Sequence, residues 1–326
     1  MLFDELKTDL GIHGQEKPKP YSPLFKDRFR DNSLLTAMER AFVIDIQNVA
    51  DYLLNANWKT MWNYSDFPNV APPFPDVWME YQVKDPKGSG LHKSGVLLSS
   101  VDLYQEDPEM RRNAVQFFGL SPIESEVMTN PDFGGRWRWV VRSTAFKRIY
   151  SGEIIEMGSM WWLINKDGQL VDPKLNKFTF SDAAIQLTKA MGDDLVTVRD
   201  YLKSVNFPVM LALTFSHCRN TRIEKREPIS ESLQRARMKR GKPRLTRPHT
   251  IVIDPIKKAI QEGTGHDHYT QGAKTLHIVR GHFKTYTEDS PLFGRYKGTF
   301  WFPMHTAGTS GSAPRNEYKV KTGENE

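Results

Sequence analysis

The feature that most constrains the fold is a series of apolar runs, rich in β-branched and aromatic residues, in the middle of the chain. These runs span residues 77–83, 95–103, 136–142 and 154–164. Branched and aromatic side chains favour extended strands because they fit a pleated, half-buried surface. The sequence therefore predicts a sheet here, and N-K-D-G at residues 165–168 predicts a hairpin turn because Asp-Gly tolerates positive φ.

Helices are expected before, within and after this region of the sequence. Apolar residues at helical spacing predict one long helix over residues 32–54, and residues 108–118 predict a short one. A helix over residues 181–205 is expected to end at Phe207-Pro208, followed by a second apolar helix over residues 209–217. Together these elements predict an α+β fold, with a helical and mixed-sheet N-terminal body and a small, basic, strand-rich C-terminal module.

Five tryptophans lie in or beside the predicted strands: Trp78, Trp137, Trp139, Trp161 and Trp162. They are compatible with a ligand-binding face. A packed sheet core is the more common outcome of such alternation, and we expect the core.

The distribution of charge is uneven, although the net charge is only +6. From Arg219 onward there are 21 Lys/Arg and 11 Asp/Glu, a net of +10, and the preceding residues carry a net of −4. A basic end on a mildly acidic body favours a polyanionic partner, in particular nucleic acid. A solvated cationic surface that aids solubility is the alternative.

The expected organisation is a helix-plus-sheet body over residues 1–218, a basic linker over 219–248, a His/Arg-rich module over 249–308 and a flexible tail over 309–326. Within residues 222–247 there are ten Lys/Arg against three acids, and Gly241 and Pro243 argue against one continuous helix. The segment is expected either to follow RNA phosphates or to be a solvated linker. The candidate RNA-binding residues are Arg235, Arg237, Lys239, Arg240, Lys242, Arg244 and Arg247.

Six of the nine histidines fall between His249 and His305, around T-L-H-I-V-R-G-H-F-K-T-Y at residues 275–286. Metal-free RNA cleavage needs a base, an acid and cations, and imidazole and guanidinium groups supply these roles near neutral pH. On a strand, alternate residues share a face, whereas His277 lies across the bend expected at Gly281. Phosphate binding without chemistry is the alternative. The candidate catalytic residues are His277, Arg280, His282, Lys284 and Tyr286.

No metal or cofactor is expected. His266, His268 and the motif histidines offer four imidazoles, but they lack a recognisable zinc spacing. The single cysteine, Cys218, fits a reducing cytoplasm. The N-terminal M-L-F-D-E-L-K does not resemble a signal peptide, and the most apolar stretch, residues 209–215, is too short to span a bilayer. The expected location is cytoplasmic, without membrane contact.

The C-terminal motif resembles a known family, the second type V-A anti-CRISPR family, found in phages, plasmids and bacterial genomes. Its pattern R-P-H-I-R-R-G-H-W-x-x-Y is similar to L-H-I-V-R-G-H-F-K-T-Y here, with Phe283 at the tryptophan position. G-T-F-W-F-P at 298–303 corresponds to the closing strand of the family. Residues 74–81 and 207–214 resemble, more weakly, a strand and an apolar helix of the family. Val279, Lys284 and a longer loop at 288–297 depart from the pattern. The matching residues are His277, Ile278, Arg280, Gly281, His282 and Tyr286.

The resemblance implies a protein that recognises the nascent N-terminal peptide of a CRISPR effector on the translating ribosome and causes degradation of its mRNA. The acidic body would then read the peptide, and the basic module would act on RNA. The resemblance leaves open whether the chain is itself a ribonuclease or recruits a host nuclease.

Overall fold

The computed structural model divides the chain into two units, each described separately. The first unit comprises Met1–Thr214 and Glu224–Thr250, and the second comprises Phe215–Ile223 and Ile251–Glu326. The described residues are 1–9, 31–55, 63–84, 91–116, 118, 128–129, 136–148, 152–191, 195–227, 229–242, 244–253, 277–279, 281–292, 294–302 and 305–307.

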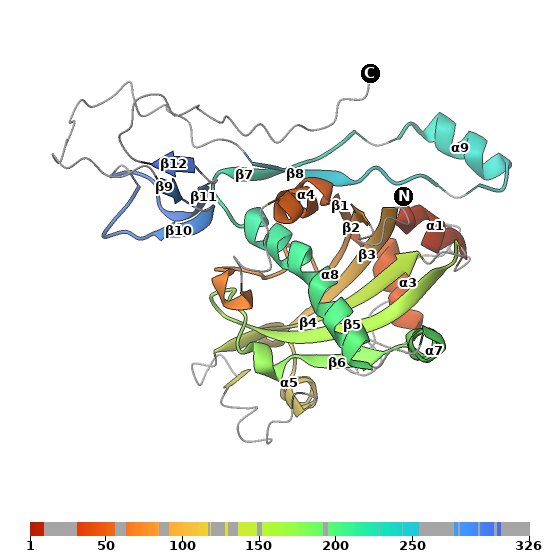
Figure 1. The fold of residues 1–326 in the computed structure, drawn as a ribbon, viewed down its shortest axis with the longest axis horizontal. Coiled ribbons are helices and arrows are strands. Elements are labelled where there is room, and N and C mark those ends of the chain that lie inside the picture. The colour runs from red at the N-terminus through yellow and green to blue at the C-terminus, as the bar shows by residue number, and fades with distance from the viewer. Residues whose placement is uncertain are drawn as a thin grey trace. The chain divides into compact units, whose positions relative to one another are not determined.

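Helices and strands follow one another in an α+β order (Figure 1). The helices are α1 (Leu2–Asp9), α3 (Asp31–Arg40), α4 (Gln47–Asn55), η2 (Tyr64–Asp66), η3 (Leu103–Gln105), α5 (Pro108–Gln116), η5 (Pro173–Leu175), α7 (Asp182–Met191), α8 (Leu195–Ser216) and α9 (Glu231–Lys239). The strands are β1 (Phe42–Asp45), β2 (Asp76–Lys84), β3 (Leu91–Asp102), β4 (Trp137–Arg148), β5 (Ile154–Asn165), β6 (Lys177–Phe180), β7 (Thr221–Glu224), β8 (His249–Ile253), β9 (His277–Val279), β10 (His282–Tyr286), β11 (Gly298–Phe302) and β12 (His305–Ala307).

A mixed sheet organises the first unit. Within this unit the described strands run in the order β6-β5-β4-β3-β2-β1, and the first two residues of β8, His249 and Thr250, pair with β1. Neighbours are antiparallel from β6 to β2, whereas β1 runs parallel to both β2 and β8. The four apolar runs predicted as strands form β2 to β5, which confirms that part of the prediction.

The expectation that the tryptophans belong to the core is confirmed for four of the five. Trp78 and Trp162 are fully buried, and Trp137 and Trp161 nearly so. Trp139 is only half-buried, and the guanidinium of Arg138 lies 4.3 Å from its ring centroid.

The single helix predicted over residues 32–54 is wrong. Two helices, α3 and α4, are separated there by the strand β1, which pairs with β2 from Phe42↔Val77 to Asp45↔Glu80. Val43 and Ile44 are consecutive and both buried, so both faces of this short segment are covered. A central strand buries successive residues in this way, whereas a surface helix buries only one side.

The helix break predicted at Pro208 is wrong as well, because α8 continues through it to Ser216. Proline removes one backbone donor and crowds the preceding turn. Nearby carbonyls accept hydrogen bonds from outside the helix: Tyr64 Oη donates to the oxygen of Lys203, and Tyr81 Oη to that of Val205, both at 2.9 Å. These partners stabilise the turn that proline weakens. None of the described helices is long and apolar enough to cross a membrane.

Two apolar clusters cover one face of the sheet. In the first, α1 and α3 pack on Trp78, Leu97 and Phe146. In the second, Ala114 of α5 packs with Val140 and Leu163 among others. The opposite face carries α8, which crosses the strands obliquely in Figure 1.

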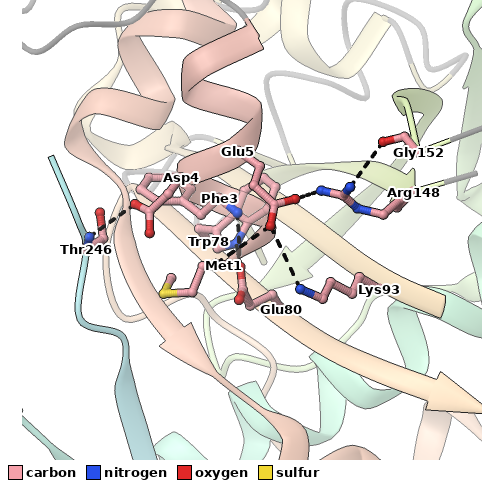
Figure 2. Close-up of polar contacts among 10 residues, drawn as sticks. All are labelled: Met1, Phe3, Asp4, Glu5, Trp78, Glu80, Lys93, Arg148, Gly152 and Thr246. Carbon is pink, nitrogen blue, oxygen red and sulfur yellow. Dashed lines mark hydrogen bonds and ion pairs between the residues drawn. The ribbon is translucent and has the colours of Figure 1, made fainter. Parts of the chain in front are cut away.

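The helix α1 is fixed to the sheet by polar contacts around an apolar centre (Figure 2). The Glu80 carboxylate oxygen Oε2 accepts hydrogen bonds from the backbone N–H of Phe3 and from Trp78 Nε1, both at 3.1 Å. Glu5 pairs with Arg148 and lies 3.9 Å from Lys93 Nζ. Because Leu2, Phe3 and Leu6 are buried beneath these contacts, α1 is an integral layer of the first unit.

Glu80→Gln is expected to shift the pH dependence of stability. Burial raises the pKa of Glu80, against the opposing effect of its hydrogen bonds with Trp78 and Phe3. A carboxyl whose pKa is higher in the folded state loses stability as pH rises through its unfolded and then its folded pKa. Glutamine can accept both hydrogen bonds through its carbonyl oxygen and carries no charge.

Urea unfolding at about pH 4, near the ordinary pKa of a glutamate, and at about pH 8, well above it, checks this. The variant should gain stability relative to the wild type at the higher pH. An identical difference at both pH values would contradict a destabilising buried charge at Glu80.

Candidate nucleic-acid interface

Three of the predicted catalytic side chains lie on one face of the β10–β11 hairpin in the second unit. The hairpin is antiparallel, with His282 opposite Phe302, Lys284 opposite Phe300 and Tyr286 opposite Gly298. Because side chains alternate along a strand, His282, Lys284 and Tyr286 share a face with Phe300 and Phe302. We call these five residues the β10 face.

The β10 face combines rings with a cation. The His282 imidazole stacks on Phe302 with ring centroids 5.4 Å apart and planes at 10°. The Lys284 ammonium lies 4.8 Å from the Tyr286 ring centroid, and Tyr286 meets Phe300 edge-on at 5.9 Å. Lys284 is exposed, and His282 and Tyr286 are half-buried. Such a surface can stack an unpaired base and hold a phosphate beside it.

The other face of the hairpin is anchored within the second unit. The Phe283 and Trp301 rings pack against Phe215 with centroids 5.6 and 5.2 Å apart. The Asn220 side chain bonds both backbone groups of Trp301, donating to its oxygen and accepting from its N–H, each at 2.9 Å. The hairpin is thus held by rings and by an amide that replaces a neighbouring strand.

Two other predicted catalytic residues are not brought onto the β10 face by the described part of the chain. The backbone of His277 belongs to β9, which pairs with β12 opposite Ala307, but its side chain lies outside the described residues. Arg280 lies outside them entirely, as do His266 and His268. The bend predicted at Gly281 corresponds to the interruption between β9 and β10.

The predicted RNA-binding residues lie on α9 and on the non-helical segment that returns beside it. Gln234 joins the two arms, donating to the oxygen of Leu245 at 2.8 Å and accepting from its N–H at 3.0 Å. Gly241, at φ +66, turns the chain where α9 ends. The segment expected to be a basic linker thus contains α9 and a returning segment of chain joined to it, residues 230–242 and 244–247, which we call the α9 hairpin.

The cations of the α9 hairpin fall into two groups. Arg244 forms an ion pair with Glu231 at 2.8 Å, the Arg247 guanidinium donates to the oxygen of Glu227, and Arg237 also has a partner. Four other cations are exposed, and within the described residues they form no ion pair: Arg235, Lys239, Arg240 and Lys242. Arg235 and Lys239 are four residues apart on one side of the helix, so their charges can reach the same phosphate backbone.

Sequence reasoning missed a row of polar residues across the sheet of the first unit. The strand register places Asp76, Ser99, Arg142, Trp161 and Lys177 in successive opposite positions. Ser99 donates to Asp76 at 3.0 Å, Arg142 donates to Ser159 at 3.1 Å, and the Arg142 guanidinium lies 5.5 Å from the Trp161 ring. This polar row puts a carboxylate and a guanidinium two strands apart, roughly 10 Å. No single-sequence signal identifies it, because it depends on register.

Cys218 does not supply a reactive thiol. Burial raises its pKa to about 12, so the group stays protonated near neutral pH. Cys218 comes two residues after the end of α8 and is buried, so it packs at the end of that helix.

Comparisons with protein-family models, with curated proteins and with solved structures found no match for this chain.

Proposed function

We propose that this protein binds single-stranded RNA and causes degradation of an mRNA during its translation. The observation that carries the proposal is the β10 face, where an imidazole, an ammonium and aromatic rings share one surface. Bases stack on rings of this kind, and phosphates pair with the neighbouring cation. A surface that served only as core would bury Lys284, which is exposed.

The α9 hairpin supports the same proposal from the first unit. Its four exposed cations, which form no ion pair with a described residue, lie on a support fixed by Gln234. Ordering the hairpin before binding reduces the entropy lost when phosphates are gripped. Contacts of this kind give affinity without sequence preference, so the choice of transcript must come from another interaction.

The family resemblance suggests that the transcript is chosen through recognition of the nascent peptide. The target is then the emerging N-terminal peptide of a CRISPR effector, read on the ribosome in the cytoplasm of a cell that carries a phage or mobile element.

Cleavage by the chain itself would require two proton-transfer groups. In metal-independent cleavage, a base takes the proton of the 2′-hydroxyl, the 2′-oxygen attacks phosphorus, and an acid protonates the departing 5′-oxygen. His282 and His277 are the candidates for these roles, with Arg280, Lys284 and Tyr286 against the phosphate charge. Recruitment of a host nuclease is the second candidate. It is favoured by the stacking of His282 on Phe302, an arrangement suited to holding a base.

His282→Ala is expected to abolish loss of the target transcript in a translating extract while leaving the fold intact. The half-buried imidazole contributes stacking on one ring, so its removal should cost about 1 kcal/mol of stability. Transcript abundance and urea unfolding are measured together. His92→Ala, at a half-buried histidine of the first unit, is the matched control.

Incubation of the purified protein with end-labelled RNA in chelator separates the two candidates. Cleavage that disappears in His282→Ala supports an intrinsic ribonuclease, and intact RNA beside transcript loss in the extract supports recruitment. Full transcript loss with the His282→Ala protein would remove the β10 face from the proposal.

A further inference from the structure

Three aromatic rings from distant parts of the chain meet where parallel strands of the first unit begin. Phe42 is the first residue of β1, His249 is the first of β8, and Phe74 lies two residues before β2. Because β1 is parallel to both β2 and β8, the three strands start at the same end of the sheet. The Phe42 ring centroid is 4.2 Å from that of His249 and 4.4 Å from that of Phe74. We call this group the ring stack.

The ring stack is only partly covered by protein. Phe74 is 39% exposed, and Phe42 and His249 are half-buried. The Phe42 and His249 planes differ by 15°, so the two rings lie nearly face to face. Burial, followed by the charge of Lys225, lowers the pKa of His249. The imidazole is therefore neutral at pH 7 and stacks as a flat ring, and Phe74 leaves part of an aromatic ring open to solvent.

The charged groups beside the ring stack favour an anion. Lys225 lies close enough to His249 to affect its pKa. In the sequence, the exposed Arg226 follows Lys225, and the exposed Arg247 comes two residues before His249. Two exposed carboxylates, Glu224 and Glu227, leave the group with a net positive charge. Rings beside cations are the combination that recognises unpaired bases, since every base offers a π-face and carries a phosphate.

We propose that the ring stack is a base-stacking site for single-stranded nucleic acid, with one base on Phe74 and a flanking phosphate against the cations beside His249. This site belongs to the first unit and shares no residue with the β10 face. The proposal rests on the proposed function only for the choice of RNA over DNA. The shared chemistry is that of a single-stranded polynucleotide.

Fluorescence titration of the full chain with an RNA of about 12 nucleotides containing 2-aminopurine tests the site, because stacking quenches this base. Phe74→Ala should weaken binding about five-fold or more and restore the fluorescence, the typical effect of losing one stacked base. Phe74→Trp should bind at least as tightly as the wild type. Val196→Ala, at a residue 47% exposed in α8, is the control and should change neither readout.

The same titration with single-stranded DNA and with a duplex completes the test. Comparable loss with RNA and DNA assigns a general stacking site, loss with RNA alone assigns an RNA site, and the duplex should be insensitive to Phe74→Ala. If the wild type binds RNA and Phe74→Ala binds it equally well, the ring stack is not a nucleic-acid site, although the proposed function survives. Absence of RNA and DNA binding by the wild type overturns both.

Discussion

Replacing Arg235, Lys239, Arg240 and Lys242 together by alanine should lower affinity for single-stranded RNA about 100-fold at physiological salt. Each Lys or Arg that contacts a phosphate releases about 0.7 counterions from a single strand. Four lost contacts should therefore reduce the slope of log affinity against log salt by about 2.8. The remaining cations of the α9 hairpin have protein partners, as Arg244 has in Glu231, so they contribute less.

Fluorescence anisotropy of a labelled RNA over a series of salt concentrations measures both quantities. The matched control removes four exposed cations elsewhere in the first unit: Arg136, Lys166, Lys174 and Lys189. It changes the net charge equally and should keep most of the affinity. If the control loses as much affinity as the hairpin variant, overall charge rather than the α9 hairpin attracts RNA.

Trp78→Ala should lower the free energy of unfolding by about 3–5 kcal/mol, the usual cost of removing a large buried ring. Trp78 is fully buried and lies 5.2 Å from Phe3 and 5.6 Å from Phe146, ring centroid to ring centroid. Its indole N–H also donates to Glu80, which receives the N–H of Phe3 (Figure 2). The substitution therefore removes the ring at the centre of the apolar contacts under α1 and one of the two hydrogen bonds that Glu80 accepts.

Urea unfolding measures the loss, with Trp139→Ala as the control. Trp139 is half-buried and stacks on Arg138, so its removal should cost about 1–2 kcal/mol. Trp78→Phe keeps a ring but loses the donor to Glu80, and should fall between the two. Equal losses for Trp78→Ala and Trp139→Ala would show that α1 is not held by the buried ring.

Much of the secondary structure could be predicted from local pattern, because β-branched and aromatic runs favour strands wherever they are paired. The exceptions are segments where tertiary contacts outweigh local preference. Residues 42–45 lie between two helices, yet they form β1 because β2 and β8 flank them. Pro208 would end an isolated helix, but Tyr64 and Tyr81 bond carbonyls close to it.

The candidate sites also combine features that follow from local sequence pattern with features that depend on which strands pair. A period of two was enough to place His282, Lys284 and Tyr286 on one face, and that arrangement is present in β10. The aromatic partner of His282, Phe302, required knowledge of the hairpin register. The ring stack depends on which strands are neighbours across more than 200 residues of chain, from Phe42 to His249, and a single sequence carries no signal for that.

The division of the chain into units has a consequence for synthesis and for dissection. Residues 215–223 belong to the second unit but are separated from the rest of it by residues 224–250, which belong to the first. During translation, Phe215 and Asn220 emerge well before Phe283 and Trp301, the residues they hold. The second unit therefore completes its folding late in synthesis. A fragment starting at residue 251 would lack Phe215, expose the rings of Phe283 and Trp301, and aggregate. A fragment that keeps the β10–β11 hairpin folded must therefore also contain residues 215–223, either in the same chain or added as a separate peptide.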